Sequence, residues 1–366
     1  MGKINSIDKK IARRETKVIK VGNILIGGKN PIVIQGMTKT YTKDVDSTLK
    51  QIEELKNLGA KIVRLAIKDR EDARAIGRIK KYTDLALVAD IHFDWQLAIL
   101  AMEEGIDKIR LNPGNLYEKK KIKSIVEVAK AKKIPIRVGV NSGSLRSLKE
   151  RRNKFVDISE LMVKEAKSYI KILEDLKFFD IVISLKASDI FSTIKAYKKM
   201  AKICNYPFHI GLTATGTFTC GIVKSTLALG LLLCQGIGDT LRVSLTAPPQ
   251  EEVKVAKFIL EGLNLNRSSS VEIISCPTCG RCEVDLIKIV DILDNKLSTI
   301  NYGLSASPLK LAVMGCVVNG PGEAKEADLG IAFGKRQGLL FKKGRPIKKV
   351  DYKDCINIIL DEVNKF

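Results

Sequence analysis

The stretch "LALVADIHFDWQLAILAMEEGIDKIRLNPG", residues 85–114, contains the pattern from which the fold can be predicted. It begins with a short run rich in aliphatic residues, 85–91, and ends with a second such run, 108–114. Between them, "WQLAILAMEEG" at 95–105 has apolar residues at helical spacing and a closing glycine. A strand, a helix and a second strand in this order predict one βαβ unit with parallel strands.

The same unit repeats along the chain. The other runs predicted as strands are 31–37, 61–67, 135–141, 180–186, 208–214 and 240–246. Amphipathic patterns separate the strands, and in "STLKQIEELKNLG" (47–59) Leu49, Ile52 and Leu55 share one helix face. Strands and helices alternating through about eight units favour an α/β fold of the (β/α)8, TIM-like barrel type over an open doubly wound sheet.

The chain is predicted to divide into two domains. The barrel, with a hairpin-like stretch at 18–28 before its first strand, is expected to occupy residues 1–263. The polar, serine-rich "NLNRSSS" at 264–270 is expected to be a linker. Residues 271–366 then form a smaller α+β domain that carries a cluster of cysteines and a glycine-rich region.

The charge of the chain is strongly positive, because Lys and Arg exceed Asp and Glu by 63 − 41 = 22. Such a charge suits nucleic acid, a membrane surface or small polyanions. The basic runs lack the interleaved aromatic residues that stack on bases, so we expect anion-binding pockets and no nucleic-acid partner. No run approaches ~18 apolar residues and the N-terminus is polar, so we expect no membrane partner and a cytoplasmic location.

Polar side chains gather at the ends of the predicted strands, where barrel enzymes carry their chemistry. Arginine inside an otherwise aliphatic strand needs a partner, because an unpaired buried guanidinium is costly. Pairing with Asp90 or with glutamates of the facing loops is one interpretation for any single arginine. For the set, we favour a multiply charged phosphate ligand. We expect a site role for His92 and a core position for His209. The side chains concerned are Gln35, Thr38, Arg64, Asp90, His92, Arg110, Asn112, Arg137, Asn141, Lys186, His209, Thr213, Arg242 and Ser244.

The cysteines cluster in "SCPTCGRC" (275–282) and at Cys316. Zinc ribbons use two paired knuckles, whereas Cys316 has no cysteine close by and no histidine follows it. A [4Fe–4S] cluster accepts one C-x2-C pair together with remote thiolates. On spacing alone, the cluster ligands are Cys276, Cys279, Cys282 and Cys316.

Several stretches together resemble the bacterial 4-hydroxy-3-methylbut-2-en-1-yl diphosphate synthases of the non-mevalonate isoprenoid pathway. They are "VADIHFD" (88–94), "RLNPGN" (110–115), "RVGVNSGSL" (137–145), "LKASD" (185–189), "GIGDTLRVSLT" (236–246), "CPTCGR" (276–281) and "GCVVNGPGEA" (315–324). The resemblance covers nearly the whole chain. It implies an iron–sulfur oxidoreductase that opens the ring of 2-C-methyl-D-erythritol 2,4-cyclodiphosphate and removes a hydroxyl, yielding 4-hydroxy-3-methylbut-2-enyl diphosphate. The electrons come from a [4Fe–4S] cluster that flavodoxin or ferredoxin reduces.

The resemblance also implies residue roles. The cluster ligands become Cys276, Cys279, Cys316 and Glu323, with Cys316 and Glu323 also taking part in catalysis, and Cys282 is not a ligand. The family is a homodimer in which the barrel of one subunit faces the cluster domain of the other. The implied substrate-binding residues are Arg64, Asp90, His92, Arg110, Asn112, Arg137, Asn141, Lys186, Lys224, Arg242 and Ser244.

Two positions depart from the family pattern. The seventh strand is followed by Thr213-Ala214-Thr215-Gly216, where relatives have a glutamate at the position of Ala214, and Thr219 replaces a common basic residue. A basic RNA-binding protein with a metal cluster and an inactive barrel is therefore an alternative. A barrel enzyme acting on another phosphate ester, with structural zinc, is a third hypothesis.

Overall fold

The computed structural model describes residues 11–145, 157–266, 271–297, 309–317, 322 and 325–366. The chain separates into two compact units, Met1–Asn266 and Arg267–Phe366. The division between them falls inside the stretch 264–270 that the sequence suggests as a linker. Within the described residues, no helix has the length and apolar character needed to cross a membrane.

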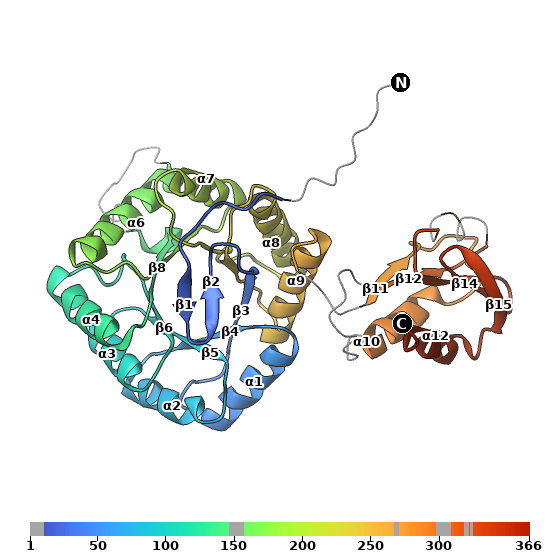
Figure 1. The fold of residues 1–366 in the computed structure, drawn as a ribbon, viewed down its shortest axis with the longest axis horizontal. Helices are drawn as coiled ribbons and strands as arrows, with labels where there is room; N and C mark the ends of the chain where they lie inside the picture. The colour runs from blue at the N-terminus through green and yellow to red at the C-terminus, as the bar shows by residue number, and fades with distance from the viewer. Residues whose placement is uncertain (1–10, 146–156, 267–270, 298–308, 318–321, 323–324) are drawn as a thin grey trace, which may run out of the picture. The chain divides into compact units, whose positions relative to one another are not determined.

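The first unit is a barrel of parallel strands, as the repeating pattern predicts (Figure 1). Its 8-stranded sheet has the order β8-β7-β6-β5-β4-β3-β10-β9, and a parallel bridge between Ile183 and Phe208 joins the two outer strands. The strands are β3 (Val33–Met37), β4 (Ile62–Ala66), β5 (Ala86–Ile91), β6 (Lys108–Leu111), β7 (Ile136–Asn141), β8 (Ile181–Lys186), β9 (His209–Ile210) and β10 (Thr240–Leu241).

Helices surround the strands and bury their apolar faces against them. They are α1 (Val45–Asn57), α2 (Arg70–Lys80), α3 (Trp95–Glu103), α4 (Lys119–Lys132), α6 (Ile158–Asp175), α7 (Ile190–Ala201), α8 (Phe218–Leu233) and α9 (Pro249–Gly262), with a short 3₁₀ turn η1 at Ser142–Ser144. Many begin at an aspartate whose carboxylate accepts a hydrogen bond from the first turn, as Asp94 does from the Gln96 backbone N–H. Each of these aspartates marks the residue at which the loop after a strand ends and the next helix begins.

A hairpin closes the amino-terminal end of the barrel. Strands β1 (Ile19–Val21) and β2 (Ile24–Ile26) pair antiparallel and lie inside the ring in Figure 1. Val21 and Ile26 pack against Val33, Ile62 and other residues near the strand starts. The carboxyl ends of the strands are the opposite end of the barrel, where TIM-barrel active sites lie.

Strands β9 and β10 are shorter than the predicted runs 208–214 and 240–246. A Cβ atom at Gly211 would lie 2.5 Å from the Arg242 carbonyl oxygen and 2.7 Å from the Lys186 ammonium. The Gly211 backbone therefore passes close to the Arg242 backbone and the Lys186 side chain, and only glycine leaves space there. Side-chain bonds replace the ladder beyond this point, and the Ser244 hydroxyl donates to the Leu212 carbonyl at 3.1 Å.

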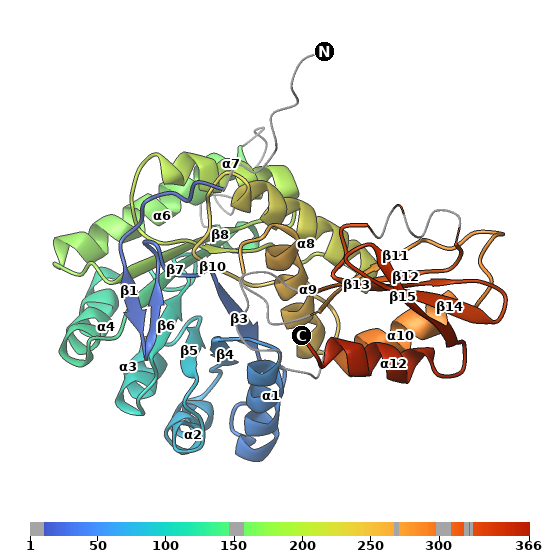
Figure 2. The same ribbon diagram turned by 45° about the vertical axis from the view of Figure 1, so that its right-hand side comes forward.

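In the described residues of the second unit, a five-stranded mixed sheet packs with the helices α10 and α12. The sheet order is β11-β12-β13-β14-β15, parallel from β11 to β13 and antiparallel from there on. Helices α10 and α12 pack on one face of the sheet (Figure 2), as the buried cluster of Leu293, Ile331 and Ile359 shows. The elements are β11 (Val271–Ser275), α10 (Leu286–Leu297), β12 (Leu309–Met314), β13 (Leu329–Phe333), β14 (Gln337–Lys342), β15 (Arg345–Asp351) and α12 (Cys355–Val363).

Candidate active site

The interior of the barrel is polar and cationic, although TIM-barrel interiors are usually filled by branched aliphatic side chains. Alternation along β6 explains how: Ile109 and Leu111 pack outward in the main core, so Lys108 and Arg110 point inward. Both inward side chains are buried. The same alternation on the other strands gives the basic side chains of the interior, which are Arg64, Lys108, Arg110, Arg137, Lys186 and Arg242.

Asp90 is the carboxylate at the centre of this set. It lies at the end of β5, is 7% exposed, and its Oδ1 is 3.1 Å from Arg110 Nη1 and 3.8 Å from Arg64 Nη1. Burial by itself raises the pKa of Asp90, but Arg64, His92 and Arg110 outweigh it and hold that pKa well below the usual value. Asp90 is therefore a permanent anion that orients two guanidinium groups.

The Arg110 side chain extends from β6 to the neighbouring strand β7. Its Nη2 donates to the Gly139 carbonyl at 2.9 Å, and its Nη1 lies 2.9 Å from His92 Nε2. A Cβ atom at position 139 would lie 2.5 Å from Arg110 Nε, so only glycine leaves space for this guanidinium. Gly139, which the sequence alone did not single out, thus sets the position of Arg110.

His92 stands at the exposed edge of the site. Its side chain is 41% exposed, and its Nδ1 lies 3.0 Å from the Asn115 side-chain amide. Its Nε2 lies 2.9 Å from Arg110 Nη1 and 3.2 Å from Asp90 Oδ2, so the ring contacts both members of the buried ion pair. His92 is thus held from both sides while part of its ring stays accessible to a ligand.

Arg64 completes the group around Asp90. It belongs to β4, and its Nε and Nη2 contact the Met37 sulfur at 3.1 and 2.8 Å. Burial lowers the pKa of Arg64 to about 10, with Arg242 and Arg110 acting in the same direction and Asp90 opposing them. Arg64 is still charged at neutral pH.

Glu252 is a second buried carboxylate that sequence reasoning missed. It is 2% exposed in the first turn of α9, and its Oε2 accepts from Arg242 Nε at 3.3 Å. Its Oε1 accepts from the Leu245 backbone N–H at 2.9 Å and lies 3.2 Å from Lys39 Nζ. The one available signal was a glutamate in the first turn of the helix that follows strand 240–246, which places it beside the end of that strand.

The side chains of Lys186 and His209 are buried next to each other. Lys186 Nζ lies 3.3 Å from His209 Nε2, and His209 Nδ1 lies 3.4 Å from the Thr240 hydroxyl. Burial lowers the pKa of His209 well below its usual value, and the neighbouring cation Lys186 lowers it further. His209 is therefore a neutral acceptor inside the barrel, which agrees with the core position expected for it.

The other predicted binding residues are arranged differently. Asn112 is buried and joins two loops, donating to the Ser144 hydroxyl in η1 at 3.0 Å and accepting from the Gly114 N–H in its own loop at 3.2 Å. The hydroxyl of Ser244 is bonded to a backbone carbonyl, as described above. Asn141 is half-buried at the end of β7, and Lys224 is half-buried on α8 rather than on a strand. Asn112 thus shapes the mouth of the barrel.

The loop after β9 carries an unusual residue. Ala214 is exposed and has a φ of 51°, in the left-handed region that side chains other than glycine rarely adopt. The next residue, Thr215, fixes the loop, because its hydroxyl donates to the Ser244 carbonyl at 2.6 Å. The loop therefore presents a methyl group where the family pattern has an acid.

In the second unit, two of the predicted ligands follow neighbouring parallel strands. Cys276 comes directly after β11 and Cys316 comes two residues after β12, and the pairing of Ser275 with Val313 brings these strand ends together. The Gly315 N–H donates to Cys276 Sγ at 3.3 Å. These two thiols therefore belong to one edge of the sheet.

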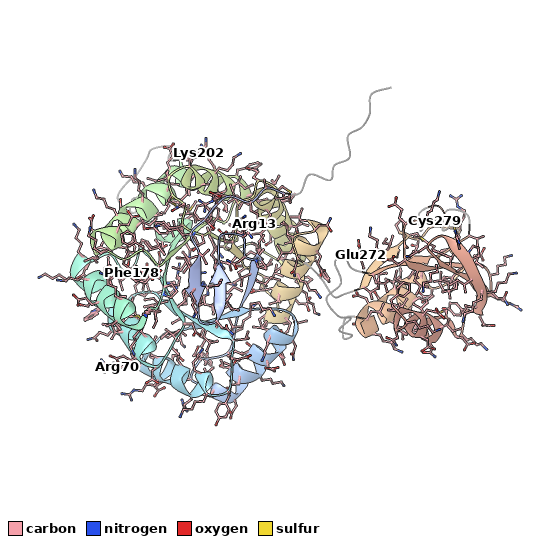
Figure 3. The ribbon with its side chains drawn as sticks, viewed as in Figure 1. Arg13, Arg70, Phe178, Lys202, Glu272 and Cys279 are labelled. Atoms are coloured by element: carbon pink, nitrogen blue, oxygen red, sulfur yellow. The ribbon has the colours of Figure 1, made fainter. Side chains whose placement is uncertain are left out.

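The other two cysteines of the stretch 275–282 differ from each other. Cys279 is exposed (Figure 3), whereas Cys282 is half-buried and donates from Sγ to the Val284 carbonyl at 3.2 Å. A Cβ atom at Gly315 would lie 2.4 Å from Cys282 Sγ, so that sulfur is packed under the loop that carries Cys316. Glu323 lies outside the described residues.

The described cysteines are not gathered around a single ion. Among the residues that the structure describes, no group of three or more His, Cys, Asp or Glu side chains is arranged to hold one metal ion. A cuboidal iron–sulfur cluster is larger than an ion and keeps its thiolates further apart. Three thiols at or next to one sheet edge fit such a group, since thiolates are the ligands that it prefers.

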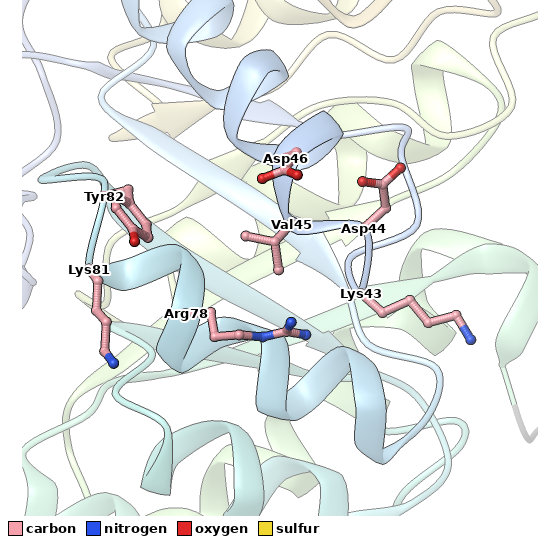
Figure 4. A pocket seen from close by; sticks show the side chains of 7 residues that line it. All are labelled: Lys43, Asp44, Val45, Asp46, Arg78, Lys81 and Tyr82. Atoms are coloured by element: carbon pink, nitrogen blue, oxygen red, sulfur yellow. The ribbon is translucent and has the colours of Figure 1, made fainter.

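A surface pocket of ≈ 440 Å³ lies outside the barrel interior, between the start of α1 and the end of α2 (Figure 4). Two of its charged groups already have partners, since Lys43 pairs with Glu71 at 2.8 Å and Asp44 caps α1. It has none of the buried cations of the barrel, so we do not place the active site there.

Comparison with known proteins identifies the family. Residues 16–257 match the family domain described as "GcpE TIM-barrel domain", and residues 272–365 match "GcpE protein C-terminal domain". The protein of Lawsonia intracellularis named "4-hydroxy-3-methylbut-2-en-1-yl diphosphate synthase (flavodoxin)" is 50% identical over 355 residues, which cover 96% of this chain and 97% of that protein. Proteins with the same name from Fusobacterium nucleatum and Caldicellulosiruptor saccharolyticus are 50% and 51% identical, over 96% and 95% of this chain and 96% and 98% of their own lengths.

Solved structures support the fold alone. The dihydropteroate synthase of Burkholderia cenocepacia superposes with a TM-score of 0.51 at 12% identity, covering 68% of this chain and 96% of that protein. None of these relatives supports the RNA-binding alternative. With both family domains present in order and half of all residues shared with its relatives, the chain belongs to the GcpE family, as its motifs indicated.

Proposed function

We propose that this protein is a 4-hydroxy-3-methylbut-2-en-1-yl diphosphate synthase. It opens the ring of 2-C-methyl-D-erythritol 2,4-cyclodiphosphate and removes one hydroxyl group as water, with two electrons supplied by reduced flavodoxin. The names of relatives about 50% identical over 96% of the chain support this reaction. The structural observation that carries the proposal is the barrel interior, where buried cations outnumber the carboxylates that orient them.

The arrangement of charge suits a compact diphosphate. Asp90 aligns Arg64 and Arg110 from one side of the barrel, and Glu252 aligns Arg242 from the other. Each carboxylate engages only part of the guanidinium N–H groups, which leaves others to bind phosphoryl oxygens in pairs. Because these cations are fixed by buried partners before a ligand arrives, little ordering is required when the substrate binds.

We assign the second unit the role of holding a [4Fe–4S] cluster. Its ligands are Cys276, Cys279, Cys316 and, by family resemblance, Glu323. The hydrogen bond from Cys282 Sγ to a carbonyl and its packing against Gly315 support leaving Cys282 out of this set. When bound, the cluster supplies electrons one at a time to the substrate. A carboxylate is a more exchangeable ligand of iron than a thiolate, which suits a cluster that must open a position to substrate.

The domain roles and the assembly complete the proposal. Residues 1–263 bind the cyclic diphosphate, 264–270 connect, and 271–366 hold the cluster in a cytoplasmic homodimer. We infer that the active site combines the barrel of one subunit with the cluster domain of the other. Light scattering of the purified protein tests the assembly, and a strictly monomeric mass in solution would contradict it.

Anaerobic purification followed by metal analysis tests the function. We expect about four irons and four sulfides per chain and a broad absorption band near roughly 400 nm, the signature of such clusters. Stoichiometric zinc without iron would contradict the cluster and favour a structural zinc protein. With the cluster in place, reduced flavodoxin should convert the cyclodiphosphate to product, and a fully loaded protein that turns over none of it would contradict the proposed reaction.

A further inference from the structure

A buried polar layer lies deeper in the barrel than the groups that surround Asp90. Lys108 occupies the inward position of β6 that precedes Arg110, roughly 7 Å along the strand. It is 0% exposed, and within the described residues its Nζ makes no hydrogen bond. Both amide atoms of Gln35 are also buried without a partner in the described residues, as are Nε and Nη1 of Arg137, which lies opposite Arg110 in the register of β6 and β7. Such orphaned polar atoms are costly, so this layer needs an explanation.

Only cations and neutral groups face Lys108. Arg64 from β4 and Arg137 from β7 are the charged groups that act on it, and Lys108 in turn acts on His209 of β9. Among the described residues, no carboxylate forms an ion pair with Lys108. Strand β8 contributes the uncharged Ser184 at the inward position before Lys186.

Four carboxylates are buried in the described part of the barrel unit, and all are committed elsewhere. Asp239 pairs with Arg13, and Asp72 accepts from the backbone N–H groups of Lys43 and Lys68. Asp90 is held by Arg110, Arg64 and His92. Glu252 is held by the Arg242 side chain and by the Leu245 N–H. In the free barrel, an ammonium on Lys108 would therefore be buried, unpaired and close to like charges, which is the least favourable setting for it. Burial first, and then Arg137 and Arg64, lower the pKa of Lys108 well below its usual value, which favours the neutral amine over the ammonium.

We propose that Lys108 is the charge-balancing residue of the phosphate site and takes up a proton from solvent when the cyclic diphosphate binds. The inference rests on the proposed function, because it needs a dianion in the barrel. Two negative charges about one side-chain layer above Lys108 reverse the local potential, and a buried site screens them weakly. The ammonium then adds to the cations that face the ligand. The electrostatic field of a monoanionic or neutral analogue is too weak to cause protonation of the Lys108 amine. Lys108 therefore makes the site prefer ligands with two negative charges.

The pH dependence of binding follows from this order of events. The amine is neutral in the free protein and protonated in the complex, so binding consumes one proton. Affinity is independent of pH below the pKa of the free protein and falls as pH rises between the free and bound pKa values. Within that window, one proton corresponds to an increase of about tenfold in Kd per pH unit.

Calorimetry of the unreduced full-length protein with 2-C-methyl-D-erythritol 2,4-cyclodiphosphate tests the proposal. Without reductant there is no turnover, and both phosphoryl groups of this ligand keep their charge near neutral pH. The same titration in two buffers of different ionisation enthalpy gives the number of protons taken up. We expect close to one proton for the wild-type protein at neutral pH, with Kd rising as pH rises.

Lys108→Met is the decisive variant, because methionine matches the length of the neutral side chain. We expect it to fold with an unchanged or higher Tm, to take up no proton, and to bind with a Kd that no longer varies with pH. At every pH, the Kd of this variant should approach the value that the wild-type protein has at high pH. The matched control is Lys119→Met, at an exposed position in the first turn of α4, which should leave both proton uptake and Kd unchanged.

Three results would overturn the inference. The first is wild-type binding without proton uptake and with a flat pH profile, which decides the matter even if Lys108→Met fails to fold. The second is full uptake in Lys108→Met together with its loss in Lys186→Met, which would move the titrating group to Lys186. The third is the absence of any cyclodiphosphate binding by the wild-type protein, which would overturn the proposed function itself, and this inference with it.

Discussion

The barrel and the second unit build their functional groups in opposite ways. In the barrel, Asp90 and Arg110 are buried and lie opposite each other in the register of β5 and β6. In the second unit, Cys279 is exposed and Cys316 is half-buried, both in segments that follow strands. Groups held by strand register are in place before a ligand binds, whereas thiols in loops depend on the metal itself to bring them together.

The largest expected effects come from removing proposed cluster ligands. Cys279→Ser and Cys316→Ser should each lose the iron and more than about 100-fold in activity, because even indirect partners of a metal ligand can cost 10–100-fold. Cys282→Ser is the matched control, since its sulfur bonds to the Val284 carbonyl, and it should keep both iron and activity. Iron and sulfide analysis of the anaerobically purified variants checks this. Equal loss of iron from Cys282→Ser and Cys279→Ser would show that spacing alone had identified the ligands correctly.

A barrel substitution tests the opposite claim, that strand geometry alone positions the cations. Gly139→Ala places a Cβ 2.5 Å from Arg110 Nε and must displace the guanidinium. Loss of one charge-assisted contact corresponds to about 1.5–3 kcal/mol, so KM should rise by about tenfold or more while iron content is unchanged. Gly143→Ala is the control, because a Cβ there meets no atom within 4 Å. A KM like that of the wild-type enzyme in Gly139→Ala would show that Arg110 can bind substrate from another position.

The fold was more predictable than the partners of its buried charges. Successive side chains of a strand point to opposite faces, and this made it possible to recognise Arg64 and Arg137 within aliphatic runs. The βαβ repeat predicted the barrel correctly. Glu252 escaped notice because it belongs to a helix, where a glutamate in the first turn is ordinary, and only the folded chain brings it to Arg242. Lys108 escaped notice because it stands at the start of a strand, where lysine is usually exposed.

A smaller effect is expected where a carboxylate acts on substrate only through an arginine. Glu252→Gln removes the charge opposite Arg242 Nε but keeps an oxygen that can accept from the Leu245 N–H. Arg242 should lose orientation, and we expect KM to rise about three- to tenfold with a smaller change in kcat. Glu251→Gln, whose carboxylate pairs with Lys254 near the surface, is the control. If kcat and Tm fall in Glu252→Gln while KM stays constant, Glu252 has a structural role and does not position Arg242.

The smallest effect is expected in the loop after β9. Here a loop, and not strand register, sets the position of a residue, as it does for the thiols of the second unit. Ala214 has a φ of 51°, and relief of this left-handed strain favours glycine by about 1–2 kcal/mol. The greater freedom of glycine in the unfolded chain offsets part of this gain, so Ala214→Gly should raise the free energy of unfolding by about 0.5–1 kcal/mol. Thermal or urea unfolding measures the change. Ala131→Gly, at an exposed position inside α4, should shift stability the other way by about 1 kcal/mol. If both variants destabilise the protein equally, Ala214 is not strained. In that case the residues of the loop, like those of the strands, have unstrained backbone conformations.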